Sequence, residues 1–392
     1  VGASYALTSI FICVAIGGGI GASVIISQHF GGHAYSRMKT SIRTAMLSFL
    51  LISLLLGGIG LCFSRQIMEA LNTPADAMDI AVIYLNIYFY GLPFLFMYNI
   101  LSSMFNALGE SRIPLYLLIF SSVLNIFLDL YMVATLHLGV AGAAYATFIA
   151  QGISAVCSFL IFLHTLRRLD GKAETWFSKA EFSSMSRIAL PSILQQSTVS
   201  IGMMLVQSVV NGFGTQILAG FSAGMRIESL CVVPMAAIGN ALSSYTAQNI
   251  GAEKHERISL GYRTANIMVA ITAIILCLFL ELLHRPLIAL FLDGAPSAQT
   301  VATGEGYLRF IGFFFCMIGF KMAVDGILRG AGAVKVFTIA NLVNLGLRVL
   351  IAKLGAPVYG IAMIWYAVPL GWLANFLISY GYYRTGKWKQ IS

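Results

Sequence analysis

One carboxylate lies inside an apolar stretch that is long enough to cross a lipid bilayer. Asp129 falls within Ile113–Thr135, and Asn125 precedes it by one helical turn, so both side chains share a helix face. A charge at such a position costs roughly 2.5–3.5 kcal/mol on insertion scales and usually serves an ion pathway or a proton relay. Two oxygen-bearing side chains suit a hard cation such as Na⁺, and a desolvated carboxylate can equally bind H⁺. The alternative is that Asp129 lies near the outer surface and is solvated or only hydrogen-bonded.

Three further charged residues, Glu228, Lys321 and Arg348, also fall within apolar stretches in the second half of the chain. They predict a second site, for a proton or for a substrate. The alternatives are an internal ion-pair network or, in the case of Lys321, an ammonium group that extends to the membrane surface.

Aromatic and amide side chains indicate where an organic molecule would bind. Tyr84 and Tyr88 belong to an aromatic stretch, and aromatic faces attract organic cations. Gln195, Gln196 and Gln207 lie together on a later apolar stretch. We expect both groups to be candidates for the lining of a substrate cleft. The alternatives are packing for the tyrosines and hydrogen bonds between helices for the glutamines.

The composition is that of a membrane protein. The chain is 58% hydrophobic and only 10% charged, whereas a soluble domain carries about 25% charged residues. Eleven apolar stretches approach or exceed the roughly 20 residues that span a bilayer, and each should be a helix. They are Ser4–Gln28, Thr44–Phe63, Ile80–Met104, Ile113–Thr135, Leu138–Leu166, Ile188–Phe213, Ile217–Asn249, Tyr262–Leu283, Val301–Leu328, Val336–Leu354 and Val358–Tyr383.

The chain has a net charge of +9, and the positions of its basic residues indicate the membrane topology. When the eleven stretches are threaded alternately, most Lys and Arg residues fall in one set of loops, and only Arg65, Arg285 and Lys353 fall in the other. The positive-inside rule places the basic set, and the C-terminus, in the cytoplasm. We therefore expect a multi-pass protein of the cell membrane and no nucleic-acid partner. The sequence has no nucleotide-binding loop and no metal-ligand spacing, so an enzyme is not expected and no cofactor is predicted.

A block near the start of the chain recurs in the second half. Gln28 and Gln248, 220 residues apart, each precede a glycine by three positions, and many flanking residues match at the same offset. Six stretches fall within one period, so both copies cross the membrane in the same sense, as in transporters built from parallel repeats. The repeated Gln block predicts the tight turn that follows the same helix in each half.

The repeat predicts two lobes with unequal helix numbers. Residues 1–166 form an N-terminal lobe, the polar segment 167–187 a cytoplasmic linker, and residues 188–392 a C-terminal lobe. Residue 1 aligns with Phe221, yet the second half has one more stretch before that point. We therefore expect that one helix precedes Val1, and that the complete protein has twelve spans with both ends in the cytoplasm.

The repeated motifs resemble those of the multidrug and toxic compound extrusion (MATE) family, in its bacterial form. The resemblance rests on the Gln-x-x-Gly block ending the second helix of each half, on Leu328–Gly332 with its first-half relative Phe105–Gly109, and on Ala189–Pro191. It covers the whole chain, as family helices 2–6 in the N-lobe and 7–12 in the C-lobe. It implies an all-α bundle of two six-helix lobes that face a central cleft. It also implies a monomeric antiporter in the bilayer that expels organic cations and amphipathic drugs in exchange for Na⁺ or H⁺.

The resemblance also assigns roles to residues. The family's N-lobe cation site uses an Asn and an Asp one turn apart on helix 5, which Asn125 and Asp129 match. It uses a Thr on helix 6, which Thr147 matches, and an Asp on helix 1, which would lie in the expected preceding segment. Some relatives carry an acidic residue midway along helix 10, where this chain has Phe314–Met317. This departure favours the N-lobe over the C-lobe as the coupling site.

Three other functions deserve comparison with the antiporter. A flippase for lipid-linked precursors, from the same superfamily, would need a more cationic cleft than the few intramembrane cations here provide. A facilitator of the other large parallel-repeat class would carry an acidic residue in the loop 31–43, which has none. A scaffold or receptor would not need duplicated lobes with a buried carboxylate. The sequence therefore predicts the antiporter, with the flippase as the alternative.

Overall fold

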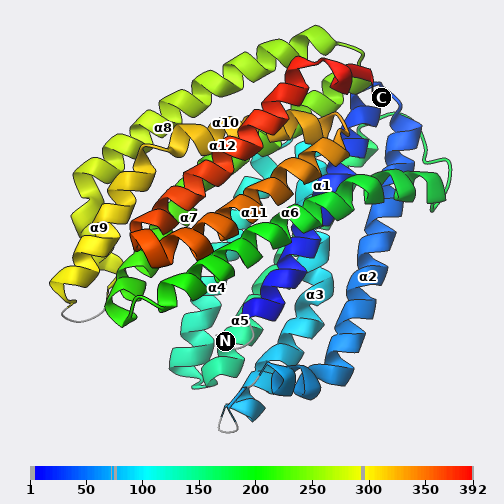
Figure 1. Cartoon of the computed structure of the whole chain (residues 1–392). Helices are drawn as coiled ribbons and strands as arrows, with labels where there is room; N and C mark the ends of the chain where they lie inside the picture. Colours follow the sequence, from blue (N-terminus) through cyan, green and yellow to red (C-terminus); the bar gives the residue numbers. More distant parts are fainter. Residues whose placement is uncertain (1–4, 72, 75–76, 293–295, 391–392) are drawn as a thin grey trace. The chain divides into compact units, whose positions relative to one another are not determined.

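The computed structural model describes residues 5–71, 73–74, 77–292 and 296–390, and the regular elements within these ranges are all helices (Figure 1). The first half contains α1 (Tyr5–Gly31), α2 (Tyr35–Ala70), α3 (Met78–Ala107), α4 (Arg112–Asp129), the π-helix η1 (Leu130–Thr135) and α5 (Gly139–Arg167). The second half contains α6 (Lys179–Asn211), α7 (Thr215–Gly251), α8 (His255–Phe291), α9 (Ala298–Gly312), α10 (Phe315–Gly330), α11 (Val334–Tyr359), α12 (Ala362–Arg384) and the 3₁₀-helix η2 (Lys387–Gln390).

These helices have the length and composition of membrane spans. Within the described ranges, ten are long and apolar enough to cross a bilayer, and the pair α9–α10 makes an eleventh if it is counted as one span. Leu278 and Leu282 of α8 are 58% and 78% exposed, so their side chains would contact lipid tails. The protein is therefore a multi-pass membrane protein, and the all-α fold predicted from the apolar stretches is confirmed.

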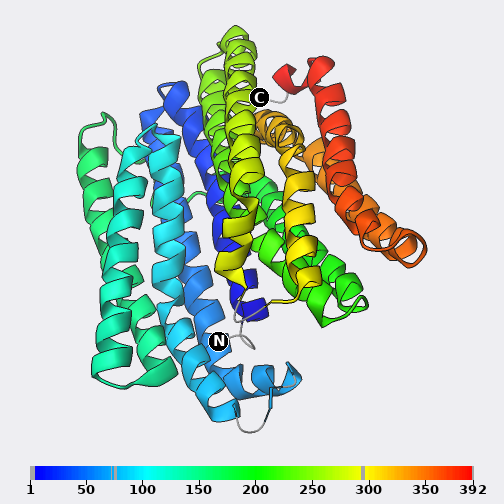
Figure 2. The ribbon, with the colours of Figure 1, turned by 90° about the vertical axis from the view of Figure 1, so that its left-hand side faces the viewer.

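One predicted span is broken. The stretch Val301–Leu328 was expected to be a single helix, but α9 and α10 bend by 52° at Phe313 and Phe314. There the backbone forms a tighter turn than an α-helix, because the Phe314 amide donates to the Ile311 carbonyl, three positions back, at 2.9 Å. Figure 2 shows the two helices in yellow and orange. The equivalent helix of the first half, α3, is continuous and contains Pro93.

The internal repeat is visible in the helix packing. In the first half α3 packs on α1, α2 and α5, and α4 packs on α5. In the second half the α9–α10 pair takes the place of α3, because it packs on α7, α8 and α12, while α11 packs on α12. Large side chains of the central helix fill the first core, with Phe89 and Phe96 each 1% exposed. The predicted duplication is therefore confirmed as a duplicated packing arrangement.

Glycine allows the closest of these helix contacts. A Cβ added at Gly239 of α7 would lie 2.7 Å from the Met322 carbonyl oxygen of α10. Its first-half counterpart, Gly19 of α1, has the same relation to α3, where a Cβ would lie 2.5 Å from the Ser103 hydroxyl. Small residues let helix backbones approach in lipid, and Gly19 and Gly239 therefore serve helix packing.

The repeated Gln block forms the same turn twice. The Gln28 carbonyl accepts from the Gly32 amide at 3.0 Å, and the Gln248 carbonyl accepts from the Ala252 amide at 3.0 Å. The prediction of a structural turn is thus confirmed, but the left-handed residues are not the glycines. They are His33, with φ of 56°, and Glu253, with φ of 59°. The turn therefore imposes a backbone conformation that a side chain disfavours.

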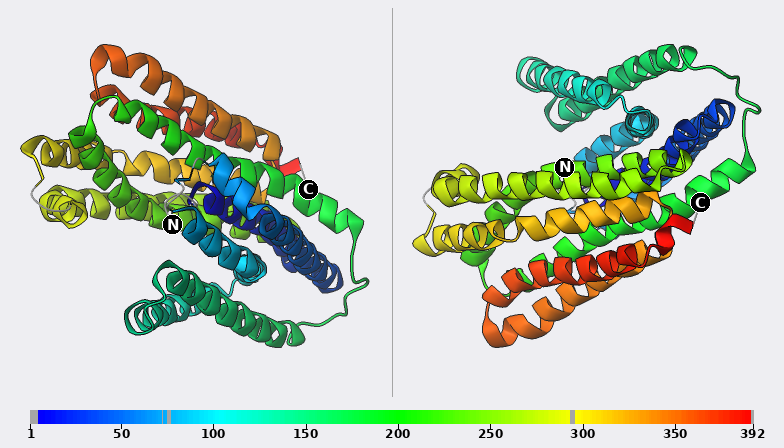
Figure 3. Two further views of the ribbon diagram at one scale, coloured as in Figure 1. Left: turned by 90° about the horizontal axis from the view of Figure 1, so that it is seen from below. Right: turned by 90° about the horizontal axis from the view of Figure 1, so that it is seen from above.

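The chain divides into two compact units, Val1–Ile193 and Leu194–Ser392, and the division falls inside α6. The lobe boundaries at residues 166 and 188 stay a prediction. The segment 167–187 was expected to be a polar linker, yet its last part is helical, because Ser178 starts α6 by accepting the Glu181 amide at 3.3 Å. Figure 3 shows the extended, non-helical segment between α5 and α6.

The left-handed turn generates a stability prediction. We expect Glu253→Gly to retain or raise the thermal unfolding temperature in detergent, because glycine adopts positive φ without steric cost. Glu253→Val should lower it, because a β-branched side chain fits this conformation worst and the cost is on the order of 1–2 kcal/mol. A Val variant as stable as the wild type would contradict the strain at this turn.

Candidate functional site

The N-terminal unit brings two of the three predicted coupling residues into contact. Asn125 of α4 donates from Nδ2 to Thr147 Oγ1 of α5 at 3.4 Å. The Thr147 hydroxyl in turn donates to the Ala143 carbonyl one turn back, at 3.1 Å. The amide oxygen of Asn125 and the remaining lone pair of Thr147 stay available as acceptors. The pair therefore links α4 and α5 by oxygen-rich side chains at one level.

Asp129 lies one turn further along the same helix. Its Oδ1 atom is buried and has no hydrogen-bond partner in the described structure. Buried polar atoms are almost always bonded, so an orphaned carboxylate oxygen calls for an explanation such as an ion or a proton that binds there. Asp129 is also the last residue of α4, and the π-helix η1 begins directly after it. Such π-segments occur mostly as short insertions at functional sites.

The chemistry of these groups fits a small cation. A carboxylate, an amide oxygen and a hydroxyl are hard oxygen ligands. Hard cations such as Na⁺ bind to such oxygens, whereas soft metal ions prefer sulfur ligands, and the carboxylate can also bind a proton. The carboxylate alone supplies the charge, so one monovalent cation would neutralise the group. Asn125, Asp129 and Thr147 would hold such an ion, and their assignment as a coupling site stays a prediction.

A small cavity adjoins this group. It has a volume of about 20 Å³, enough for one water molecule, and Thr147, Tyr84, Tyr88 and Gln151 are among the residues that line it. Tyr88 is anchored by its hydroxyl, which donates to the Thr8 carbonyl of α1 at 3.3 Å. The two tyrosines therefore lie beside a candidate coupling residue. Gln151 was not predicted as a site residue from the sequence, although it follows Thr147 by one turn on the same helix face.

Glu228 belongs to a different, fully buried group in the C-terminal unit. The Tyr307 hydroxyl of α9 donates to Glu228 Oε2 at 2.5 Å. Arg348 of α11 is close enough to act electrostatically on this carboxylate. Glu228 is 4% exposed and Arg348 is 8% exposed. Glu228 therefore has a hydrogen-bond partner in Tyr307 and a nearby positive charge in Arg348, and a proton or substrate site at these residues stays a prediction.

Lys321 takes part in another buried group. Its ammonium lies 3.0 Å from Asp325 Oδ2, one turn along α10, and donates to Asn341 Oδ1 at 3.1 Å. The other carboxylate oxygen of Asp325 accepts from the Ser379 hydroxyl at 2.7 Å. Lys321 is only 4% exposed, so its ammonium does not extend to the surface. The alternative of an internal ion-pair network describes Lys321 better than an open site.

Several members of these groups were not predicted from the sequence. Asp325 is one of them, although its spacing of four from Lys321 inside an apolar stretch is typical of an ion pair. Arg329 follows one turn later, 7% exposed, and donates from Nη2 to Asn240 Oδ1 at 2.7 Å. Tyr307 could not be found in this way, because its partner lies 79 positions earlier in the chain.

The three glutamines of α6 have different surroundings. Gln207 Nε2 donates to the Ser222 hydroxyl of α7 at 3.4 Å, which agrees with the alternative of a bond between helices. The Oε1 atom of Gln195 is buried without a partner in the described structure. The Gln196 carbonyl accepts from Ser200 at 3.3 Å. A substrate-lining role for Gln195, Gln196 and Gln207 stays a prediction.

The chain resembles known transporters in sequence and in fold. The probable multidrug resistance protein YpnP of Bacillus subtilis is 31% identical over 370 residues, which cover 94% of this chain and 82% of that protein. The probable multidrug resistance protein YoeA of the same organism is 26% identical, with coverage of 99% and 86%. A solved MOP superfamily transporter from Pyrococcus furiosus superposes with a TM-score of 0.92 at 21% identity, covering 99% of this chain and 88% of that one.

The family assignment rests on both halves of the chain. The MatE family model matches residues 1–131 and 191–354, so it includes Asn125, Asp129, Glu228, Lys321 and Arg348. The relatives span nearly the whole chain, and the solved structure shares its helical fold. The chain therefore belongs to the MatE family of multidrug transporters, which are membrane transporters rather than enzymes.

Proposed function

We propose that this protein is a secondary antiporter that exports organic cations and drugs in exchange for Na⁺ or H⁺. The observation that carries the proposal is the buried, unpartnered Oδ1 of Asp129, one turn from the Asn125–Thr147 contact. An export function also agrees with the names of YpnP and YoeA, which are called probable multidrug resistance proteins.

Neutralising the Asp129 carboxylate is the step by which the ion would drive transport. A bare carboxylate in an apolar bundle is costly, and a bound proton or Na⁺ removes that cost. Any conformation in which Asp129 is less solvated therefore gains population when the ion binds. The π-helix η1 directly after Asp129 offers a place where α4 can readjust without unwinding. We propose that ion binding and release at this point alternate the exposure of the substrate cleft.

The C-terminal charges have a different role in this proposal. Lys321 is paired with Asp325, and Glu228 has Tyr307 and Arg348 near it. Groups that already have partners are less suited to exchanging an ion in every cycle. The Lys321 ammonium is already neutralised by Asp325 and so offers little positive charge to an anionic lipid precursor, which disfavours the flippase. We propose that these groups hold the C-terminal unit together.

The coupling proposal predicts the behaviour of one conservative substitution. Asp129→Asn keeps size and polarity but removes the ionisable group, and we expect it to abolish efflux driven by an ion gradient. Efflux of a fluorescent organic cation from proteoliposomes, with Na⁺ and pH gradients imposed separately, measures this. Glu110→Gln is the matched control, because Glu110 is an exposed carboxylate in the turn after α3.

The same assay distinguishes the alternatives. A gradient of only one ion should drive the wild-type protein, and this identifies the coupling ion. Gradient-driven efflux by Asp129→Asn at the wild-type rate would remove Asp129 from the mechanism. The absence of wild-type efflux under either gradient would favour the flippase.

The C-terminal ion pair predicts non-additive effects on stability. Lys321→Met alone should destabilise the protein by about 3–5 kcal/mol, because Asp325 is left as a buried, unpaired charge. Lys321→Met with Asp325→Leu should be less destabilised than either single variant, because no buried charge remains. Thermal unfolding in detergent measures all three. If the two single effects simply add, the residues do not act as a buried pair.

A further inference from the structure

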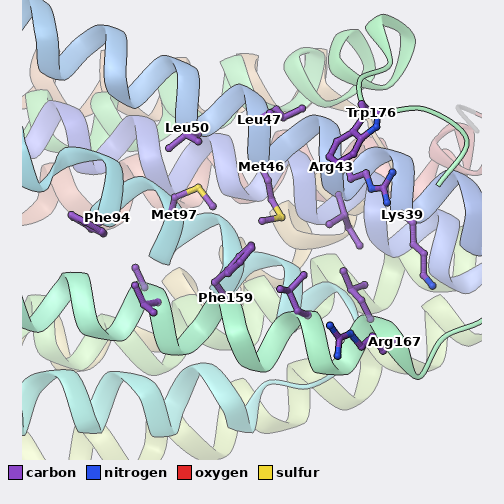
Figure 4. A pocket seen from close by; sticks show the side chains of 15 residues that line it. Lys39, Arg43, Met46, Leu47, Leu50, Phe94, Met97, Phe159, Arg167 and Trp176 are labelled. Atoms are coloured by element: carbon purple, nitrogen blue, oxygen red, sulfur yellow. The ribbon is translucent and has the colours of Figure 1, made fainter. Parts of the chain in front are cut away.

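A large groove lies on the N-terminal unit, apart from the candidate coupling residues. It has a volume of about 710 Å³ and is bounded by α2, α3, α5 and the segment that follows α5. Met97 and Phe94 of α3 form its floor, between residues of α2 and α5 (Figure 4). Its lining is predominantly aliphatic and aromatic, so most of the groove offers no hydrogen bonds.

The two ends of the groove differ in chemistry. Lys39, Arg43 and Arg167 gather at one end with Trp176, and Leu50 and Phe94 lie toward the other (Figure 4). Lys39 and Leu50 are eleven positions apart on α2, which corresponds to about 16 Å along a helix at 1.5 Å per residue. One leaflet of a bilayer has a hydrocarbon thickness of about 15 Å, half of the roughly 30 Å core. The groove thus has the length and polarity of a single leaflet.

The basic end is held in place by the segment after α5. The Lys39 ammonium donates to the carbonyls of Leu169 at 2.6 Å and of Gly171 at 2.8 Å. These bonds fix the segment that carries Trp176, whose ring lies 4.7 Å from the Arg43 guanidinium carbon. The Trp176 side chain is 75% exposed, in the manner of tryptophans that sit at the level of lipid headgroups.

Two arginines at this end have no acidic partner. In the described ranges, neither Arg43 nor Arg167 forms an ion pair. The segment after α5 has acidic residues of its own, Asp170 and Glu174, but neither is paired with these arginines. Two guanidinium groups at the mouth of an apolar groove would therefore attract an anion that has an apolar tail.

The internal repeat provides a comparison. The corresponding helices of the C-terminal unit, α8, α10 and α12, line a groove of about 540 Å³ that contains Arg263, which repeats Arg43, and Arg384, which ends α12 as Arg167 ends α5. That groove is bordered by stacked rings instead of aliphatic chains, with Phe376 and Tyr380 centred 5.3 Å apart and Tyr380 and Tyr383 centred 6.2 Å apart. The two copies thus share their basic residues but differ in what surrounds them.

We propose that the groove of α2, α3 and α5 binds an anionic phospholipid of the cytoplasmic leaflet. Its phosphate contacts Arg43 and Arg167, its headgroup lies against Trp176, and an acyl chain lies along Met97 toward Phe94. The proposal rests on the cytoplasmic position that the positive-inside rule predicts for these basic residues, but not on ion-coupled transport. A neutral lipid fills the apolar part equally well, and the arginines provide the selection for negative charge.

Lipid binding to the purified, detergent-solubilised protein tests this proposal. We would titrate phosphatidylglycerol and phosphatidylcholine with identical acyl chains and measure bound lipid by native mass spectrometry. We expect roughly tenfold tighter binding of phosphatidylglycerol, because arginine contacts add to its affinity. Arg43→Gln with Arg167→Gln should remove this preference. The matched control, Arg263→Gln with Arg384→Gln, should retain it.

A second variant tests the apolar part. Val156→Trp places a large ring in the α5 wall of the groove and should weaken both lipids alike, at an unchanged unfolding temperature. Equal affinity of the two lipids for the wild type, or equal loss in both double variants, would overturn the proposal. So would tight binding of dodecyl phosphate without phosphatidylglycerol binding, which would indicate a soluble amphipathic anion. The assay requires no transport, so its failure is distinguishable from a failure of the antiporter.

Discussion

The hydrocarbon core of a bilayer supplies neither water nor counter-ions, and this constraint explains most of the structure. Every backbone group must find its partner within the chain, so the described residues form long helices. The few charges that remain inside must also find partners. In the C-terminal unit Lys321 pairs with Asp325 and Glu228 with Tyr307, while Arg348 Nε has no hydrogen-bond partner among the described residues. In the N-terminal unit Asp129 retains an oxygen without one.

The two halves therefore have the same helix arrangement but different buried charges. The two halves share their packing and their turns, down to the left-handed residues His33 and Glu253. They differ in how buried charges are satisfied, because Lys321 and Asp325 of α10 pair with each other, whereas Asp129 of α4 retains an oxygen without a partner. The two grooves also share a basic residue and differ in their lining, which is mainly aliphatic around Arg43 and aromatic around Arg263.

Much of the fold was predictable because membrane helices are encoded locally. Apolar stretches of sufficient length specify the spans, and the repeated Gln block specifies the turn that joins two of them. The break between α9 and α10 was not predictable, because the residues there are as apolar as their neighbours and contain no proline. In the candidate site, Asn125 and Asp129 were identified from their spacing. Tyr307 was not, because its contact with Glu228 depends on how distant helices pack.

If Asp129 binds the coupling ion, and the ion and the organic cation favour different conformations of the exchanger, binding of the organic cation must release the ion. The most direct measurement is the number of protons, or of radioactive Na⁺ ions, that the purified protein releases when an organic cation is added. We predict about one ion per wild-type molecule, because a single carboxylate is available, and none for Asp129→Asn. Release of the same ion in the same amount by the variant would contradict the account.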